Sequence, residues 1–180
     1  MEVEKTKIEG ILIIKPNVFR DSRGCFLESF NIEKYKKILG GVSFVQDNLS
    51  NSMKNVLRGI HFQTPPFGQG KLVQVLQGEV LDVVVDLRRK SKTFGQYETF
   101  LLNDINKNQL WIPEGFGHAF LTKEDNTIFS YKCSNYYSTE HEKTLLWNDP
   151  QLNIDWGTEN PILSQKDNEG KLLNEMQTYF

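Results

Sequence analysis

The sequence predicts a mainly β protein, folded as an antiparallel sandwich or barrel. Ten short segments rich in Val, Ile, Leu, Phe and Tyr follow one another, with turn residues between them. Gln77-Gly78 is typical of a hairpin turn, and residues 103–108 are typical of a longer polar turn. The chain has 180 residues, 38% of them hydrophobic, which is enough for a single well-filled domain over residues 1–180.

The predicted strands are Ile11–Ile14, Cys25–Phe30, Ser43–Gln46, Val56–Phe62, Leu72–Leu76, Glu79–Leu87, Tyr97–Leu102, Gln109–Ile112, Ala119–Thr122 and Thr127–Cys133. The sixth, EVLDVVVDL, is nearly continuous in apolar residues, which is typical of a strand buried on both faces. Asp82 interrupts this strand. It is either a hydrogen-bonded core carboxylate or a cavity residue, and the core interpretation is preferred.

One helix is expected before the last third of the chain. Asn31 can cap it, its apolar residues fall on one face, and Gly40-Gly41 end it. From Leu145 onward the sequence is mixed, with two tryptophans followed by the polar run SQKDNEGK. This region predicts loops and short helices packed on the strands.

Charge and composition exclude several classes of partner. The net charge is -2 and the pI is about 6.0, so nothing favours nucleic acid or an anionic membrane surface. The first residues lack an apolar core of signal-peptide length, and the longest apolar runs are about four residues. Cys25 and Cys133 lie far apart without C-x-x-C spacing, so both are expected to be reduced thiols in a cytoplasmic protein.

The segment VLRGIHFQTPPFGQGK gathers Arg58, His61, Gln63 and Lys71 around a proline-glycine turn. A histidine is a base near neutral pH, a lysine can stabilise a developing enolate, and an arginine can grip a phosphate with two hydrogen bonds. Together they suit removal of a proton next to a carbonyl in an anionic substrate. The alternative is a strand with one satisfied core histidine and two solvated cations.

A second signal is the segment QLWIPEGFGHAFL, in which Pro113, Gly115 and His118 form a P-x-G-x-x-H turn. Glycine permits the turn and proline ends the preceding strand. His61 and His118, each expected at the start of a strand, are similar to the two halves of a cupin site. Small β-barrels of this kind hold one ligand in the mouth.

A metal in that mouth is not expected. Gln63 stands where metal-binding cupins carry a second histidine, and no glutamate lies between Gln63 and Lys71. His141 lies in the charged run TEHEK and is expected to be exposed. Two imidazoles without a carboxylate in register fall short of the ligands that a stable site needs.

Several segments together resemble the dTDP-4-dehydrorhamnose 3,5-epimerase family. They are NVFRDSRGCFLESF, FVQDNLS, VLRGIHFQTPPFGQGKLVQVLQGEVLDVVVDLR, QLWIPEGFGHAFL, YKCSNYYSTEH, LLWNDPQLNIDW and PILSQKD. RGIHFQ followed by QGKLV is specific to that family rather than to cupins in general. The resemblance implies a cupin, a jelly-roll antiparallel β-barrel with a short N-terminal helix and short C-terminal helices.

The resemblance implies epimerisation at C3 and C5 of dTDP-4-dehydro-6-deoxy-D-glucose to dTDP-4-dehydro-L-rhamnose, without metal or organic cofactor. It assigns His61 as the general base, held by Asp167, Tyr131 as the acid on the opposite side of the sugar, and Lys71 as the stabiliser of the enolate oxygen. From the residues alone, Tyr131 would be a core aromatic and Asp167 a loop N-cap. A related epimerase that acts at C3 only or C5 only remains the alternative.

For the nucleotide sugar, the resemblance implies contacts from Arg23, Glu28, Gln46, Asp47, Asn48, Arg58, Lys71, His118, Glu142 and Lys166. Tyr137 would stack on the thymine, since an aromatic face fits the ring. In this family part of each site comes from a neighbouring subunit, so a homodimer is implied. Arg23 and Glu28 are the expected donors across that interface.

Overall fold

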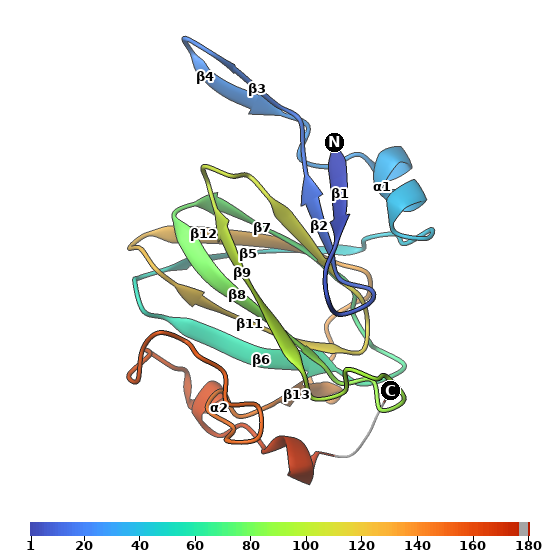
Figure 1. Ribbon diagram of the computed structural model, residues 1–180, viewed down its shortest axis with the longest axis vertical. Coiled ribbons are helices and arrows are strands. Elements are labelled where there is room, and N and C mark those ends of the chain that lie inside the picture. Colours follow the sequence, from blue (N-terminus) through green and yellow to red (C-terminus); the bar gives the residue numbers. More distant parts are fainter. Residues whose placement is uncertain (177–179) are drawn as a thin grey trace.

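Two antiparallel sheets face each other and enclose much of the apolar core (Figure 1). The structure is a computed structural model and describes residues 1–176 and 180. The six-stranded sheet has the order β1 (Glu2–Lys5), β2 (Leu12–Lys15), β10 (Gln109–Ile112), β7 (Lys71–Gln77), β12 (Thr127–Cys133) and β5 (Gln46–Ser52). The five-stranded sheet has the order β13 (Glu142–Thr144), β6 (Leu57–Gln63), β11 (Phe116–Thr122), β8 (Glu79–Asp86) and β9 (Tyr97–Asn103).

The predicted mainly β jelly roll is confirmed, but its sheets do not close into a barrel. β5 ends one sheet and β13 ends the other, and both strands contribute side chains to one polar cavity. Polar side chains therefore occupy the gap that a closed barrel would bridge with backbone hydrogen bonds.

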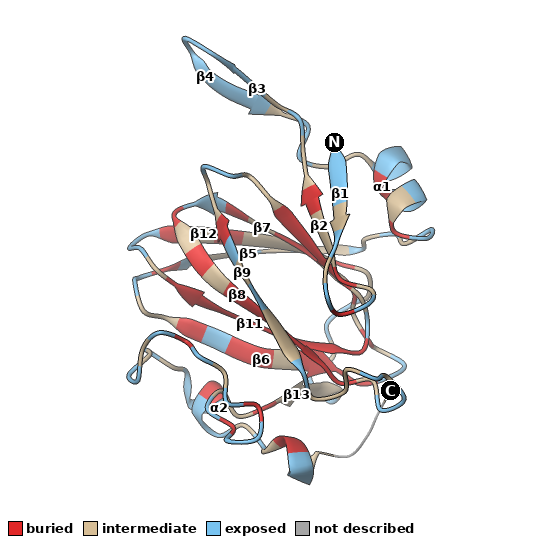
Figure 2. Ribbon diagram, viewed as in Figure 1, coloured by how far each residue is buried: buried red, intermediate tan, exposed pale blue. Residues whose placement is uncertain are grey.

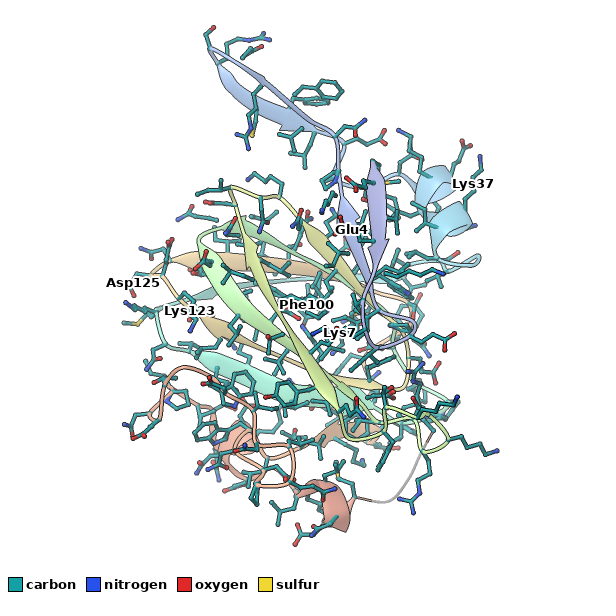
Figure 3. The ribbon with its side chains drawn as sticks, in the orientation of Figure 1. Glu4, Lys7, Lys37, Phe100, Lys123 and Asp125 are labelled. Atoms are coloured by element: carbon teal, nitrogen blue, oxygen red, sulfur yellow. The ribbon has the colours of Figure 1, made fainter. Side chains whose placement is uncertain are left out.

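The core between the sheets consists of side chains that alternate along the central strands. Val73 and Phe129 come from the six-stranded sheet, Val84 and Phe120 from the five-stranded sheet, and all are at most 5% exposed. The rings of Phe120 and Phe129 stack across the gap at 4.1 Å. Figure 3 shows Phe100 of β9 toward this interior, whereas Lys37 and Asp125 lie at the periphery. Burial of these apolar groups holds the two sheets together.

Part of the outer face of each sheet is also covered. The C-terminal third, with the short helix α2 (Gln165–Asn168) and the 3₁₀ helix η1 (Leu173–Glu175), packs Leu152 and Trp156 against the five-stranded sheet. Helix α1 (Ile32–Ile38) packs Tyr35 against Trp111 of the other sheet. Figure 2 shows the buried residues along the central strands and the exposed ribbon of β3 (Val18–Asp21) and β4 (Gly24–Leu27) beyond them. Among the described residues, no helix is both long and apolar enough to cross a bilayer.

The predicted N-terminal helix is confirmed with its caps. The side-chain oxygen of Asn31 accepts hydrogen bonds from the backbone N–H groups of Glu33 and Lys34. At the other end Gly40 and Gly41 have φ values of 65° and 90°, a left-handed conformation that ends helices at little cost for glycine. Short C-terminal helices were also predicted, and α2 and η1 confirm them.

Strand prediction succeeded where the strands are apolar. β10 and β12 have the predicted bounds. The prediction of a strand at Ser43–Gln46 is wrong, because the strand begins only at Gln46 and runs through the polar segment to Ser52. Phe44, in the predicted strand, instead packs its ring edge-on against Trp111. β1, β3 and β13 were not predicted.

A buried carboxylate ties the loop after β8. Asp86, which is fully buried, accepts hydrogen bonds from the Arg88 guanidinium at 2.9 and 2.8 Å and from the hydroxyls of Ser91 and Thr93 at 2.6 and 2.7 Å. Burial raises the pKa of Asp86, but these hydrogen bonds outweigh it and lower the pKa from 3.8 to about 2. The folded protein therefore favours the charged carboxylate.

We expect Asp86→Asn to lower the free energy of unfolding at pH 7 by about 2 kcal/mol, as the pKa difference implies. Because the folded-state pKa is depressed, this contribution is complete above the unfolded-state pKa and is lost as the pH falls toward 2. Urea unfolding of both proteins between pH 7 and pH 2.5 measures it. Asp21→Asn is the matched control, since Asp21 also pairs with an arginine two residues on but is exposed. A constant difference between wild type and Asp86→Asn at every pH would contradict the assignment.

Candidate active site

A cavity of about 600 Å³ lies between the two sheets. Much of its wall is polar, although the core beside it is apolar. Many of the residues that the sequence predicted for the site line this cavity. They are Asn48, Arg58, His61, Lys71, His118, Tyr131, Glu142, Lys166 and Asp167. The fold thus gathers charged and amide side chains from β5, β6, β7, β11, β12, β13 and α2 around one space.

His61 lies inside β6 and is the cross-strand partner of His118 in β11. The two histidines were expected at strand starts, and that expectation is wrong: they are the fifth and third residues of seven-residue strands. The Nε2 atom of His61 lies 2.5 Å from Oδ1 of Asp167, a residue 106 positions later. The His61 side chain is 24% exposed and the Asp167 side chain 4%, so the imidazole reaches the cavity while the carboxylate is buried behind it.

Burial and the carboxylate act on His61 in opposite directions. Burial lowers the pKa of His61, and the hydrogen bond and charge of Asp167 oppose it, but the net pKa is below the ordinary 6.5. Burial raises the pKa of Asp167. The hydrogen bond and the charge of His61, together with a hydrogen bond from Ser164, outweigh burial and bring the pKa of Asp167 below its usual range. At neutral pH the pair is therefore a neutral imidazole beside a carboxylate, the form in which histidine accepts a proton.

Tyr131 and Lys71 come from the opposite sheet. Tyr131, in β12, is the cross-strand partner of Asn48 in β5, and burial raises the pKa of its hydroxyl. Lys71 begins β7 opposite Cys133. Burial lowers the pKa of Lys71, and neighbouring Cys133 and Glu142 partly oppose this. A base and a protonated hydroxyl thus line one cavity from two different sheets.

His118 has its own carboxylate partner. Its Nε2 atom lies 2.8 Å from Oδ2 of Asp82, and both residues are buried. Within the part of the chain that the structure describes, Oδ1 of Asp82 has no hydrogen-bond partner. The preferred interpretation of Asp82 as a hydrogen-bonded core carboxylate is confirmed. Its partner, however, is a residue of the cavity wall.

Two further contacts fix charged groups at the rim. The Arg58 guanidinium donates to the Ser52 hydroxyl at 3.2 and 3.1 Å. Glu142 accepts from Lys166 at 2.8 Å and from the Tyr137 hydroxyl at 2.9 Å. These bonds fix the side chains of Arg58, Lys166 and Tyr137, as a site for a charged ligand requires.

Other predicted residues lie outside the cavity wall. Gln46 accepts a bond from the backbone N–H of Tyr137 at 2.9 Å, next to the rim. Asp47 faces away and pairs with Lys132. Arg23 and Glu28 belong to the segment that carries the β3–β4 ribbon, where they pair with Asp21 and Lys34, so neither reaches this chain's own cavity.

Gln63 and His141 have structural partners. The Gln63 side chain donates to the carbonyls of Phe67 and Tyr136 and accepts from the N–H of Ser138. His141 is half-buried against Phe67, so the expectation that it is exposed is wrong. In the described part of the chain, no group of three or more His, Cys, Asp or Glu side chains is placed to hold a metal ion.

Sequence reasoning missed Ser52 and Ser164, which contact Arg58 and Asp167. Ser52 left no signal, because a serine in a polar strand is unremarkable. Ser164 did leave one: a serine three residues before an acidic residue is a capping pattern, and SQKD contains it.

The chain matches the family model described as dTDP-4-dehydrorhamnose 3,5-epimerase over residues 5–175. A Shigella flexneri dTDP-4-dehydrorhamnose 3,5-epimerase is 50% identical over 172 residues, 95% of each chain. A Streptomyces niveus dTDP-4-dehydrorhamnose 3-epimerase is 39% identical over 97% of this chain and 85% of its own. The solved structure of the Legionella pneumophila dTDP-6-deoxy-D-glucose-3,5-epimerase, in complex with dTDP-4-keto-L-rhamnose, superposes with a TM-score of 0.94 at 47% identity, covering 98% of this chain and 94% of its own.

Proposed function

The chain belongs to the dTDP-4-dehydrorhamnose 3,5-epimerase family, and we propose that His61, Lys71 and Tyr131 carry out the family's reaction in it. The enzyme is an isomerase. It inverts C3 and C5 of dTDP-4-dehydro-6-deoxy-D-glucose and produces dTDP-4-dehydro-L-rhamnose. The observation that carries the assignment of residues is the His61–Asp167 pair, which shares one cavity with Tyr131 and Lys71.

Each inversion begins with removal of a proton next to the C4 ketone. His61 takes this proton through an imidazole nitrogen, and Asp167 stabilises the imidazolium that results. The electrons left on carbon move to the C4 oxygen, which becomes an enolate. The Lys71 ammonium donates to that oxygen and stabilises it more than the neutral ketone, which lowers the barrier.

Inversion then requires a proton from the other face of the sugar. Tyr131 is on the sheet opposite His61, so its hydroxyl can deliver a proton to the carbon on the face away from the base. The raised pKa of Tyr131 keeps this hydroxyl protonated at neutral pH, while the lowered pKa of His61 keeps the imidazole unprotonated. The environment thus moves the pKa values of the proposed acid and the proposed base apart.

The remaining predicted residues bind the nucleotide in this proposal. Arg58 and Lys166 hold the diphosphate, since cations at the rim match its charge. Gln46 and Asn48 approach the pyrimidine edge, Tyr137 stacks on the thymine, and Glu142 keeps Tyr137 and Lys166 in place. The predicted contact from Asp47 is not part of this proposal, because its side chain faces away from the cavity and pairs with Lys132. His118 lines the sugar end. No metal or organic cofactor takes part in the proposed chemistry.

Epimerisation at C3 alone is the second candidate, because a 39% identical relative carries that name. Single and double epimerisation use the same proton transfers, so the base and the acid do not distinguish them. Proton NMR of the dTDP-4-keto sugar in deuterated water does. Exchange of solvent deuterium into both C3 and C5 supports double epimerisation, and exchange at C3 alone supports the second candidate.

We infer a homodimer in which Arg23 and Glu28 complete the partner's site. The ribbon of β3 and β4 has two strands of four residues, and an isolated two-stranded ribbon is marginally stable in water. It also presents Phe19 and Phe26, which are 63% and 70% exposed and are cross-strand partners. A second copy that covers these rings would bury them and bring Arg23 to the nucleotide site of that second copy.

The free thiols of Cys25 and Cys133 fit the cytoplasm as the compartment.

We expect His61→Asn to lose exchange at C3 and C5 by about 10³-fold, because general-base catalysis contributes on this order. The affinity for dTDP should change little, since the phosphate contacts remain. Asp167→Asn should lose less, because the base is retained without its charge support. His141→Asn is the matched control, a half-buried histidine outside the cavity. Exchange near the wild-type rate in His61→Asn would contradict the assignment of the base.

We expect Tyr131→Phe to separate exchange from inversion. His61 can still remove a proton and return a deuteron to the same face, so deuterium should enter next to the ketone while formation of the L-configured product falls much further. The phenyl ring fills nearly the same volume, so stability should change little. Tyr97→Phe, whose hydroxyl bonds the Asn153 carbonyl instead, is the control. Equal loss of exchange and inversion would show that Tyr131 is not solely the acid.

We expect a purified heterodimer of Arg23→Ala and His61→Asn subunits to recover about half of the wild-type activity, although each homodimer is impaired. If Arg23 acts across a two-fold interface, one of the two sites receives both intact residues. If Arg23 acts within its own subunit, both sites carry a defect. Activity of the heterodimer no higher than that of the two homodimers would contradict the shared site.

A further inference from the structure

Ser164 contacts the carboxylate that holds the proposed base. It is the N-cap of α2, and its hydroxyl oxygen accepts the backbone N–H of Asp167 at 3.2 Å. The same hydroxyl donates its proton to Oδ2 of Asp167 at 2.8 Å. One hydroxyl therefore contacts both the backbone and the side chain of Asp167.

The two carboxylate oxygens of Asp167 have separate partners. Oδ1 lies against Nε2 of His61 and Oδ2 against Oγ of Ser164. A carboxylate bound through one oxygen can rotate about its last torsion, which is broad for aspartate. A second bond, on the other oxygen, removes that freedom and fixes the direction from which Oδ1 meets the imidazole.

We propose that Ser164 is a positioning residue of the epimerase, which orients Asp167 and thereby the His61 imidazole. This inference rests on the proposed role of His61 as the base. It extends the pair to a chain of three, Ser164–Asp167–His61, in which each member fixes the next. Ser164 touches no reacting atom in this role and acts through Asp167 alone.

The Ser164 bond also limits the negative charge that Asp167 directs at His61. A hydroxyl donor stabilises the carboxylate. Burial raises the pKa of Asp167, and the bond and charge of His61, followed by the Ser164 bond, bring this pKa below its usual range. Without the Ser164 bond, Oδ1 would be a stronger acceptor and would stabilise the imidazolium more, so the pKa of His61 would rise. A substitution at Ser164 leaves the other charged or titratable residues of the cavity wall in place, namely Arg58, Lys71, His118, Tyr131, Glu142 and Lys166.

Three substitutions separate positioning from helix capping. Ser164→Ala removes the hydroxyl and the cap. Ser164→Gly removes the hydroxyl, but glycine at an N-cap costs only a few tenths of a kcal/mol relative to serine. Ser164→Thr keeps both. We expect Ala and Gly to lower kcat about fivefold, the equivalent of one net hydrogen bond, with KM unchanged. The acidic limb of the kcat/KM profile should move to higher pH in both, and Thr should restore wild-type behaviour.

The remaining outcomes overturn the proposal. A Gly variant with wild-type kcat beside an impaired, less heat-stable Ala variant would mean that Ser164 only caps α2. A raised KM with unchanged kcat would mean that Ser164 contacts the substrate. If the acidic limb of the kcat/KM profile does not move, or if Ser164→Thr does not recover wild-type kcat, the chain Ser164–Asp167–His61 is excluded. His61→Asn measured in parallel separates the two levels: if it is inactive while the Ser164 variants are normal, only the role of Ser164 fails.

Discussion

The contact between His61 and Asp167 is the interaction on which the candidate site depends. It joins His61, in the five-stranded sheet, to a residue 106 positions later in the chain. The segment around Asp167 also packs on the outer face of that sheet. Asp167 is 3% exposed, and a buried carboxylate without partners would be costly. The packing of the C-terminal third and the orientation of the base therefore support each other. Loss of that packing would expose the carboxylate and free the imidazole at the same time.

The two-sheet architecture determines which chemistry the cavity can perform. His61 belongs to one sheet and Tyr131 and Lys71 to the other, so in the proposed mechanism a substrate between the sheets has a proton acceptor on one side and a proton donor on the other. A proton can leave one face and another can enter the opposite face without rotation of the sugar. In the proposed mode of binding, the nucleotide extends beyond the sugar at the open edge between β5 and β13, both of which line the cavity. An open sandwich, rather than a closed barrel, suits a ligand of this length.

Sequence reasoning predicted the apolar framework better than the polar edges. β10 and β12 were predicted to the residue because their β-branched and aromatic side chains pack in the core. β5 was misplaced, since Asn48 and Ser50 face a polar cavity and the alternation of apolar and polar residues is absent. Most of the catalytic assignments came from resemblance: Tyr131 and Asp167 alone would have been interpreted as a core aromatic and a cap. Asp167 lies in the first turn of α2, but the cap of that helix is Ser164, so the interpretation of Asp167 as a cap is wrong. Arg23 and Glu28 could not be placed, because their proposed target lies on another chain.

Burial acts on the proposed acid and the proposed base through a single physical cause. Removal of water penalises charge of either sign, so it lowers the pKa of His61 and raises that of Tyr131. Both groups are then neutral at the same pH, one ready to accept a proton and the other ready to donate. The same burial lowers the pKa of Lys71, and neighbouring Cys133, Glu142 and Asp82 oppose that effect. A more acidic ammonium is a better donor to an enolate oxygen. In the proposed mechanism these neighbours favour the charged form of Lys71, whose donors are directed at the enolate oxygen.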